Sequence, residues 1–363
     1  MKELKFRFNY NNKLIKLKIF MKINSRFLQI VCCLQIVCLL FSTGIANGKT
    51  NDFFQLEKQI STNSWSIGLS NNEKQLFVAD GMNNKILVYN LEGDLIRYFS
   101  LNDSDFCKGH IHGITVFQDK IYSVKENTDC IGIYNLEGEF LKKIGSSGKE
   151  LGKFNSPQNI EIFDKKIYVT DNENKRIQVF DLDGNFIFHF DMQENKSKKG
   201  VETPYDLEIY QEKIYVTLPK ENSIQIFDLN GNFMNNLETS KEVTDQLGIT
   251  IVNDRIFLVS GDMKQVIILD LHGKILDMIK ADFFDPHQVV IIKNKMYVLD
   301  TRNFLVKIFN LPEAYNQNFE NELENSIDYE INLIFLIPLV IAVIYLIKRF
   351  LPKKNKEPIS RIN

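Results

Sequence analysis

The chain has 363 residues, with 46 acidic and 44 basic side chains and a net charge of −2. Lys and Glu are scattered along it, so there is no electrostatic basis for binding nucleic acid. No nucleophilic serine motif, zinc-protease motif, phosphate-binding loop or glycine-rich dinucleotide motif occurs, and the sequence predicts no catalytic residue.

A secretion signal is predicted over residues 1–47. Its apolar run at 27–41 follows a Lys- and Arg-rich segment, and Gly44 and Ala46 supply a small-x-small cleavage pattern. The run is short for a membrane span and is interrupted by glutamine. Met21 is an alternative start, and an uncleaved anchor is the alternative to a cleaved signal.

Residues 48–312 contain six copies of one pattern of four short β-type segments, most clearly at 154–191. Four strands per repeat of 40–47 residues are typical of propeller blades. A single blade cannot bury both faces of its sheet, so the blades must stack around an axis. We therefore predict an all-β, six-bladed β-propeller of four-stranded antiparallel blades. Leu-x-Gly turns mark the repeats at Gly93, Gly138, Gly184, Gly231 and Gly273.

The strands of each blade are called a to d from the axis to the rim. Blades one to five each have their own d strand, but blade six stops after its c strand, at Leu311-Pro312. The segment at 53–60 precedes the first a strand and has the apolar spacing of a d strand. We predict that it completes blade six and closes the ring by strand pairing.

The segments GKFNSPQNI, IYVTD, NENKRIQVFD and DGNF of blade three resemble the NHL-repeat family, whose repeats form β-propellers, often with six blades. The resemblance covers about residues 53–311. Blades two and four depart from it, with Lys125 and Leu218 where an aspartate ends the second strand. In three other blades an aspartate there is expected to cap the following turn through its side chain: Asp80, Asp171 and Asp300.

Two faces of the ring are expected to differ. The d-to-a and b-to-c connections share one face and are longer, and ligands bind preferentially on such loops. The a-to-b and c-to-d turns share the other face, where tight turns are expected to leave little room. One position in the d-to-a connection recurs at the channel mouth and predicts a ligand-binding rim of Trp65, His112, Gln158, Tyr205 and His287.

A metal site is the alternative to a binding rim without a cofactor. His287 in DPHQV and His112 in HIHGI resemble the Pro-His setting in which enzymes of the peptidyl-hydroxyglycine amidating lyase group hold zinc on alternate blades of this propeller. The resemblance implies zinc on these histidines. The third alternate blade has Tyr205, which departs from the pattern, and Tyr205 or Asp206 would complete a site for a divalent metal, zinc or calcium. A metal-dependent extracytoplasmic enzyme, lyase-like or lactonase-like, therefore competes with the binding module that we favour.

Two cysteines remain beyond the signal. Cys107 and Cys130 are predicted to form a disulfide in an oxidising compartment, because the connections that carry them open on the same face. Two separate thiols are the alternative. Asn102 and Asn195 begin the available glycosylation sequons.

The C-terminal end predicts a membrane anchor. An acidic polar stalk at 313–330 leads into a transmembrane helix at 331–350, which contains a long uncharged apolar run. The basic tail at 351–363 is predicted to be cytoplasmic. Together with the signal, this gives a single-pass cell-membrane protein with an extracytoplasmic propeller, whose partner is a protein, peptide or glycan outside the cell.

Overall fold

The computed structural model describes residues 2–10, 13–21, 54–62, 64–101, 107, 109–194, 203–220, 222–239, 243–312 and 315. The chain divides into two compact units, Met1–Phe53 and Phe54–Asn363. In the first unit, β1 (Lys2–Tyr10) and β2 (Lys13–Met21) form an antiparallel hairpin inside the predicted signal.

Several predicted features lie outside the described residues. They are the apolar run at 27–41, the sequons at Asn102 and Asn195, the stalk at 313–330 apart from Tyr315, the helix at 331–350 and the tail. Within the part of the chain that is described, no helix has the length and hydrophobicity needed to span a membrane.

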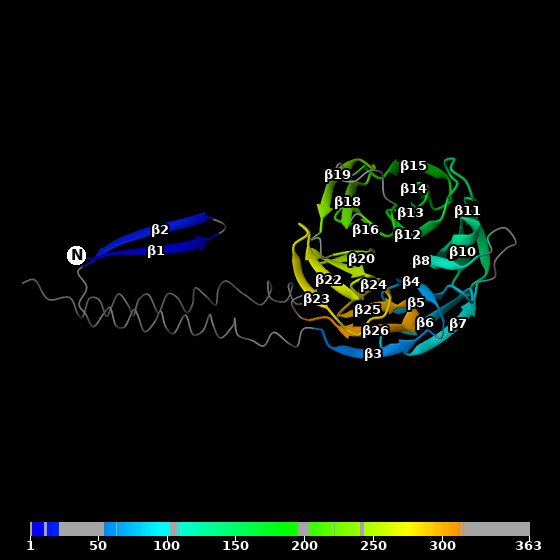
Figure 1. The fold of residues 1–363 in the computed structure, drawn as a ribbon, viewed down its shortest axis with the longest axis horizontal. Coiled ribbons are helices and arrows are strands. Elements are labelled where there is room, and N and C mark those ends of the chain that lie inside the picture. Colours follow the sequence, from blue (N-terminus) through cyan, green and yellow to red (C-terminus); the bar gives the residue numbers. More distant parts are fainter. Residues whose placement is uncertain are drawn as a thin grey trace, which may run out of the picture. The chain divides into compact units, whose positions relative to one another are not determined.

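The second unit is a six-bladed β-propeller, as predicted, with six four-stranded antiparallel sheets around a central axis (Figure 1). The a strands lie nearest the axis and are β4 (Ser66–Asn71), β8 (Ile111–Phe117), β12 (Pro157–Phe163), β16 (Leu207–Tyr210), β20 (Gln246–Val252) and β24 (Pro286–Ile292). The b strands are β5 (Gln75–Asp80), β9 (Lys120–Lys125), β13 (Lys166–Asp171), β17 (Lys213–Leu218), β21 (Arg255–Ser260) and β25 (Lys295–Asp300).

The outer half of each blade completes the sheet. The c strands are β6 (Lys85–Asn90), β10 (Cys130–Asn135), β14 (Arg176–Asp181), β18 (Ser223–Asp228), β22 (Gln265–Asp270) and β26 (Leu305–Asn310). The d strands are β7 (Leu95–Ser100), β11 (Phe140–Ile144), β15 (Phe186–Asp191), β19 (Phe233–Glu238), β23 (Ile275–Ile279) and β3 (Leu56–Ser61). Two short 3-10 helices, η1 (Glu126–Thr128) and η2 (Thr301–Asn303), lie in b-to-c connections.

The core lies between the blades. Each of the six blade interfaces holds one cluster of buried apolar side chains, and each b strand is buried because neighbouring blades cover both of its faces. An aromatic residue near the middle of every b strand is at most 2% exposed. Burying such a side chain stabilises the fold by about 1.5 to 3 kcal/mol. These residues are Phe77, Tyr122, Tyr168, Tyr215, Phe257 and Tyr297.

The aspartates that end b strands have structural roles. Asp171 accepts a hydrogen bond from the Asn155 amide at 2.7 Å and pairs with the Arg176 guanidinium at 2.7 Å. Asp300 pairs with Lys307 at 3.1 Å. These contacts join the d-to-a connection to the start of the c strand within one blade, and they occupy the carboxylates that a metal would otherwise use.

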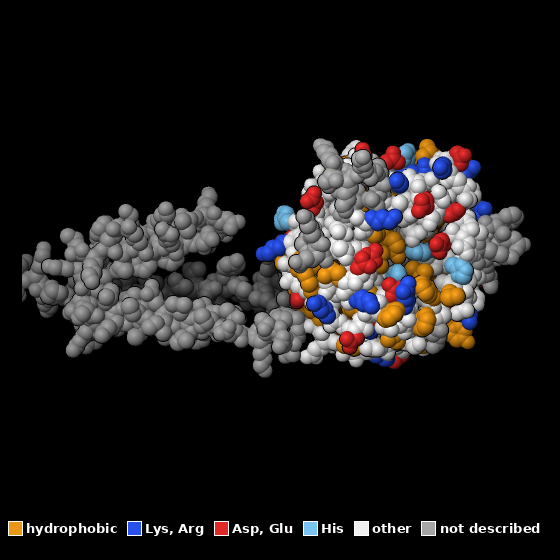
Figure 2. Space-filling view, viewed as in Figure 1, with side chains coloured by type: hydrophobic (Ala, Val, Ile, Leu, Met, Phe, Trp, Pro, Cys, Tyr) orange, Lys and Arg blue, Asp and Glu red, His pale blue; other side chains and the backbone are white. Residues whose placement is uncertain are grey.

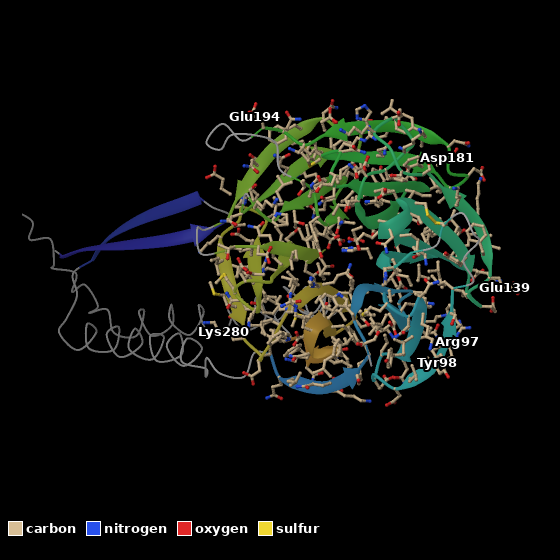
Figure 3. The ribbon with its side chains drawn as sticks, turned by 45° about the vertical axis from the view of Figure 1, so that its right-hand side comes forward. Arg97, Tyr98, Glu139, Asp181, Glu194 and Lys280 are labelled. Atoms are coloured by element: carbon tan, nitrogen blue, oxygen red, sulfur yellow. A yellow bond between two sulfur atoms is a disulfide. The ribbon has the colours of Figure 1, made fainter. Side chains whose placement is uncertain are left out.

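A second link within one blade is covalent. Cys107 and Cys130 form a disulfide, with their Cα atoms 6.0 Å apart. The yellow bond in Figure 3 lies in blade two. It ties the connection before β8 to the first residue of β10, so the b-to-c side of this blade is held to its entry segment.

Ring closure occurs by strand pairing, as predicted from the missing d strand of blade six. β3 pairs antiparallel with β26, with Ile60 opposite Val306. The Ile60 side chain is 6% exposed and packs in the cluster between blades six and one. Leu56 lies on the same strand but is 43% exposed.

We predict that Ile60→Ala destabilises the propeller by about 2 to 4 kcal/mol, because it removes buried methyl groups at the closure and leaves a cavity. Leu56→Ala is the matched control, and we expect it to change the free energy of unfolding by less than about 0.5 kcal/mol. Denaturant unfolding measures both. Equal effects of the two substitutions would contradict the inference that the buried Ile60 side chain stabilises the ring closure.

Candidate functional site

Four of the predicted rim residues come together at one end of the axial channel. His112, Gln158, Tyr205 and His287 line a narrow pocket of about 20 Å³, together with Ile67. The His112 and Tyr205 rings meet edge-on with centroids 6.0 Å apart, and His112 Nδ1 lies 3.1 Å from the Gln158 carbonyl oxygen. Figure 2 shows histidine side chains near the middle of the face in view. The pocket has room for about one water molecule.

Trp65 is not part of this group, and its assignment was wrong by two residues. Ser66 pairs with Asp80 just as Pro157 pairs with Asp171 in blade three. The residue that follows Ser66, Ile67, therefore takes the rim position in blade one. No proline marks the start of β4, so the phase of the repeat was lost there. The Trp65 ring lies instead beneath the Arg302 guanidinium, 5.8 Å from its centroid.

The histidines of the mouth are held in their neutral form. Burial and the nearby His112 ring lower the pKa of His287 to about 4. Burial also lowers the pKa of His112, against the opposing effect of Glu126. Burial raises the pKa of the Tyr205 hydroxyl. At neutral pH this mouth therefore presents two uncharged imidazoles and a phenol, and His287 Nδ1 is buried without a hydrogen-bond partner.

A much larger cavity occupies the axis beyond this mouth. This axial well has a volume of about 680 Å³ and is walled by the a strands of all six blades. It runs from the level of Asn159, Asp206 and Gln288, which it shares with the narrow pocket, to the a-to-b turns at Lys74 and Gln118. The expectation that the turn face leaves little room is therefore wrong at the axis.

The partition between the two cavities is made of hydrogen-bonded side chains. Each a strand is the edge strand of its sheet nearest the axis. The backbone amides on that open edge therefore need hydrogen-bond partners from elsewhere. Gln288 accepts from the Leu69 amide at 2.5 Å, and Asp206 accepts from the amides of Leu207 and Ile249 at 2.7 and 3.0 Å. Asn159 also donates to Asp206. All of these bonds except the one from Leu207 cross between blades and hold the inner strands together.

One level further into the well, the six blades present one equivalent residue each. We call these six residues the carboxylate-level ring. Each lies opposite the central aromatic residue of the b strand in its own blade, as Glu161 does with Tyr168 and Glu208 with Tyr215. Two neighbouring blades thus supply carboxylates, and the other four supply hydroxyls or an alkyl group. The ring consists of Ser70, Thr115, Glu161, Glu208, Thr250 and Val290.

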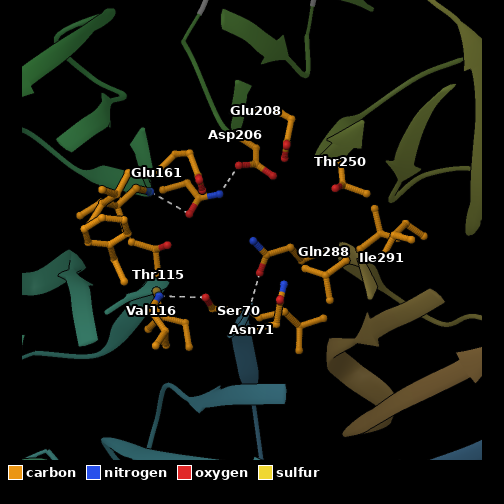
Figure 4. A pocket seen from close by; sticks show the side chains of 18 of the residues that line it. Ser70, Asn71, Thr115, Val116, Glu161, Asp206, Glu208, Thr250, Gln288 and Ile291 are labelled. Atoms are coloured by element: carbon orange, nitrogen blue, oxygen red, sulfur yellow. Dashed lines mark hydrogen bonds between the residues drawn. The ribbon is translucent and has the colours of Figure 1, made fainter. Parts of the chain in front are cut away.

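The carboxylates of the well are strongly perturbed. Burial, followed by the charge of Asp206, raises the pKa of Glu161 to about 8. Burial, followed by the charge of Glu161, raises the pKa of Glu208 well above its usual value. Burial raises the pKa of Asp206 to about 6, although three hydrogen bonds oppose this. Figure 4 shows Glu161, Asp206 and Glu208 along one side of the open space, with Ile291 across from Glu161.

Sequence analysis missed Glu161 and Glu208. Glu161 and Glu208 lie in segments that were assigned only as inner strands, and the repeat places them at the same phase, 47 residues apart. That phase was the available signal. It was not followed because an acidic residue in a strand is ordinarily exposed, whereas the inner strand of a propeller borders the axis.

Comparisons with known proteins support the fold. No family model matches the chain, and no curated sequence does. A solved structure of a catalytically inactive virginiamycin B lyase from Staphylococcus aureus, with quinupristin, shares 16% identity at a TM-score of 0.51 and covers 70% of this chain and 88% of that one. A streptogramin B lyase structure gives 16% identity, a TM-score of 0.51 and coverage of 71% and 88%.

The similarity extends to a protein of another kind. The WD40 propeller domain of Doa1 shares 14% identity at a TM-score of 0.52, with coverage of 69% of this chain and 80% of that one. Identities this low establish the propeller fold alone. The class of protein that the fold and site define is thus a six-bladed propeller with an acidic axial well. The likeness to NHL repeats stays a resemblance.

The metal alternative leads to a measurable outcome. Among the described residues, no group of three His, Cys, Asp or Glu side chains is placed to hold a metal ion. Elemental analysis of purified wild type and of His112→Ala tests the metal alternative. One zinc or calcium per chain that disappears in the variant would establish the site at His112 and His287, and a wild type without bound metal would contradict it.

Proposed function

We propose that this protein is a binding module that takes its ligand into the axial well. The observation that carries the proposal is the well itself, with its volume of about 680 Å³ and its lining by strands from all six blades. Ligand sites of proteins are typically clefts of about 300 to 1,000 Å³ that hold a few precisely placed polar groups. The lining of this well is more polar than is usual, and Glu161, Asp206 and Glu208 are its acidic groups nearest the partition.

The well supports binding better than the histidine mouth does. The mouth pocket of about 20 Å³ cannot admit a ligand without movement of His112 or Tyr205. The well opens beside the a-to-b turns, whose residues include Asn72 and Lys74. A ligand is thus expected to enter from the turn face and to stop at the partition formed by Asn159, Asp206 and Gln288.

Two observations favour the enzyme alternative. His112, Tyr205 and His287 converge, and three of the similar structures are of virginiamycin or streptogramin B lyases. At 16% identity that similarity carries no catalytic residue to this chain. The elemental analysis described above tests this alternative directly.

We predict that Thr115→Trp abolishes ligand binding, because the indole would fill the well from an inner position that is 8% exposed. The measurement is the thermal shift produced by a fragment library on the purified protein. Thr115→Val is the isosteric control and should keep the wild-type hits, while Tyr205→Ala tests the opposite mouth. Hits that survive Thr115→Trp and vanish in Tyr205→Ala would place the ligand at the histidine mouth.

The proposed setting is the cell surface. It is supported by the apolar runs at 27–41 and 331–347 and by the basic residues that follow the second run. A disulfide in the propeller suits an oxidising compartment. The ligand would then be an extracellular molecule, free or presented on a protein, peptide or glycan partner.

We expect protease added to intact cells to remove the propeller and leave a membrane-embedded C-terminal fragment. An epitope tag added after Asn363 detects that fragment on a blot. Detergent-lysed cells are the control, in which the tag is also digested. Full protection of the propeller in intact cells would overturn the proposed topology without affecting the proposed binding in the well.

A further inference from the structure

The walls of the axial well are chemically unequal. At the level of Glu161 and Glu208, blades three and four present carboxylates, whereas blade six presents Val290 at the equivalent position. Ile291 and Ile251 also line the well. Figure 4 shows that the acidic side chains share one side of the open space, and Ile291 lies on the other. A ligand in this well would meet carboxyl groups on one side and an alkyl surface on the other.

Among the described residues, the acidic side chains of the well have no basic partner. Two buried aspartates elsewhere in the propeller do, since Asp171 pairs with Arg176 and Asp300 with Lys307. No salt bridge within the described residues joins Glu161, Asp206 or Glu208 to a lysine or arginine, and the one basic side chain that lines the well is Lys74, at its turn end. Burying carboxylates without a counter-charge is costly, and a cationic ligand would relieve that cost.

A polar atom without a hydrogen-bond partner among the described residues lies at the histidine mouth. His287 Nδ1 is buried and has no hydrogen-bond partner. Its ring lines the narrow pocket that continues the axis beyond Asp206 and shares Asn159, Asp206 and Gln288 with the well. Buried polar atoms are ordinarily satisfied by protein, water or ligand. The channel thus offers acidic groups without a basic partner and, among the described residues, an unused hydrogen-bonding atom.

We propose that the axial well binds an organic cation, an ammonium group on a short apolar body, between Glu161, Glu208 and Asp206. The inference rests on the proposed function and names the chemistry of its ligand. An organic cation suits the site better than a metal ion, because no three acidic or histidine groups of the described chain are placed to coordinate one. The ammonium donates to the carboxylates, and the apolar body lies against Val290 and Ile291.

The test is isothermal titration of the full-length protein with hexylamine at pH 7.5, with 1-hexanol and hexanoate as the neutral and anionic probes of equal chain length. A capped Gly-Lys-Gly peptide shows whether the ammonium of a free amine or that of a lysine side chain is preferred, and binding of either supports the proposal. Calcium chloride is the inorganic probe.

The variant is Glu161→Gln with Glu208→Gln, which removes both ionisable carboxyl groups and keeps the side-chain shapes. We expect it to bind the amine at least about 10-fold more weakly, which corresponds to about 1.4 kcal/mol, because no carboxylate can then form beside the ammonium group. The matched control, Glu137→Gln with Glu194→Gln, makes the same two substitutions on exposed side chains and should bind as wild type does. Without ligand, the well variant should melt no lower than wild type, because it loses two carboxyl groups whose ionisation is disfavoured by burial.

Three outcomes would overturn the proposal. The first is that no amine binds to the wild type or that the well variant binds hexylamine equally well. The second is that 1-hexanol or hexanoate binds in preference, in which case the binding module stands and the cation does not. The third is that calcium binds and the amines do not.

Discussion

The propeller depends on the covering of every sheet face by a neighbouring sheet. Six blades provide six interfaces, and each holds its own cluster of buried side chains. The interface between blades six and one exists only if the ring closes, and closure is made by β3 and β26, segments from the two ends of the propeller sequence. The loss of that pairing would expose two apolar faces and an unpaired strand edge at once.

The same ring geometry explains the chemistry at the axis. Six a strands turn their open edges inward, so backbone amides that would otherwise lack partners lie around a channel. Asn159, Asp206 and Gln288 satisfy some of these amides and divide the channel into a small mouth and a large well. Polar side chains are therefore structurally required near the axis. Glu161 and Glu208 are not required in this way, because the other four blades have a hydroxyl side chain or a valine at the equivalent position.

The sequence was most informative where the repeat was strict. The aromatic residue in the middle of each b strand recurs at nearly constant spacing, as does the glycine after the c strand of blades one to five. Both were found where expected; Gly184, for example, adopts φ +77°. The sequence was less informative in blade one, where no proline precedes β4. The position of Trp65 was therefore taken for that of Ile67. A shift of two residues keeps a side chain on the same face of a strand but moves it along the axis.

By itself the sequence determined the repeat, the number of blades and the segment that closes the ring, because each follows from local periodicity and from a missing strand at one end. It also identified four residues of the histidine mouth, His112, Gln158, Tyr205 and His287, since these share one phase of the repeat. Only the tertiary structure decided which end of the channel has room. The width of an axial channel depends on how closely six strands from distant parts of the chain approach and on how their side chains bond across it. No local pattern contains that information.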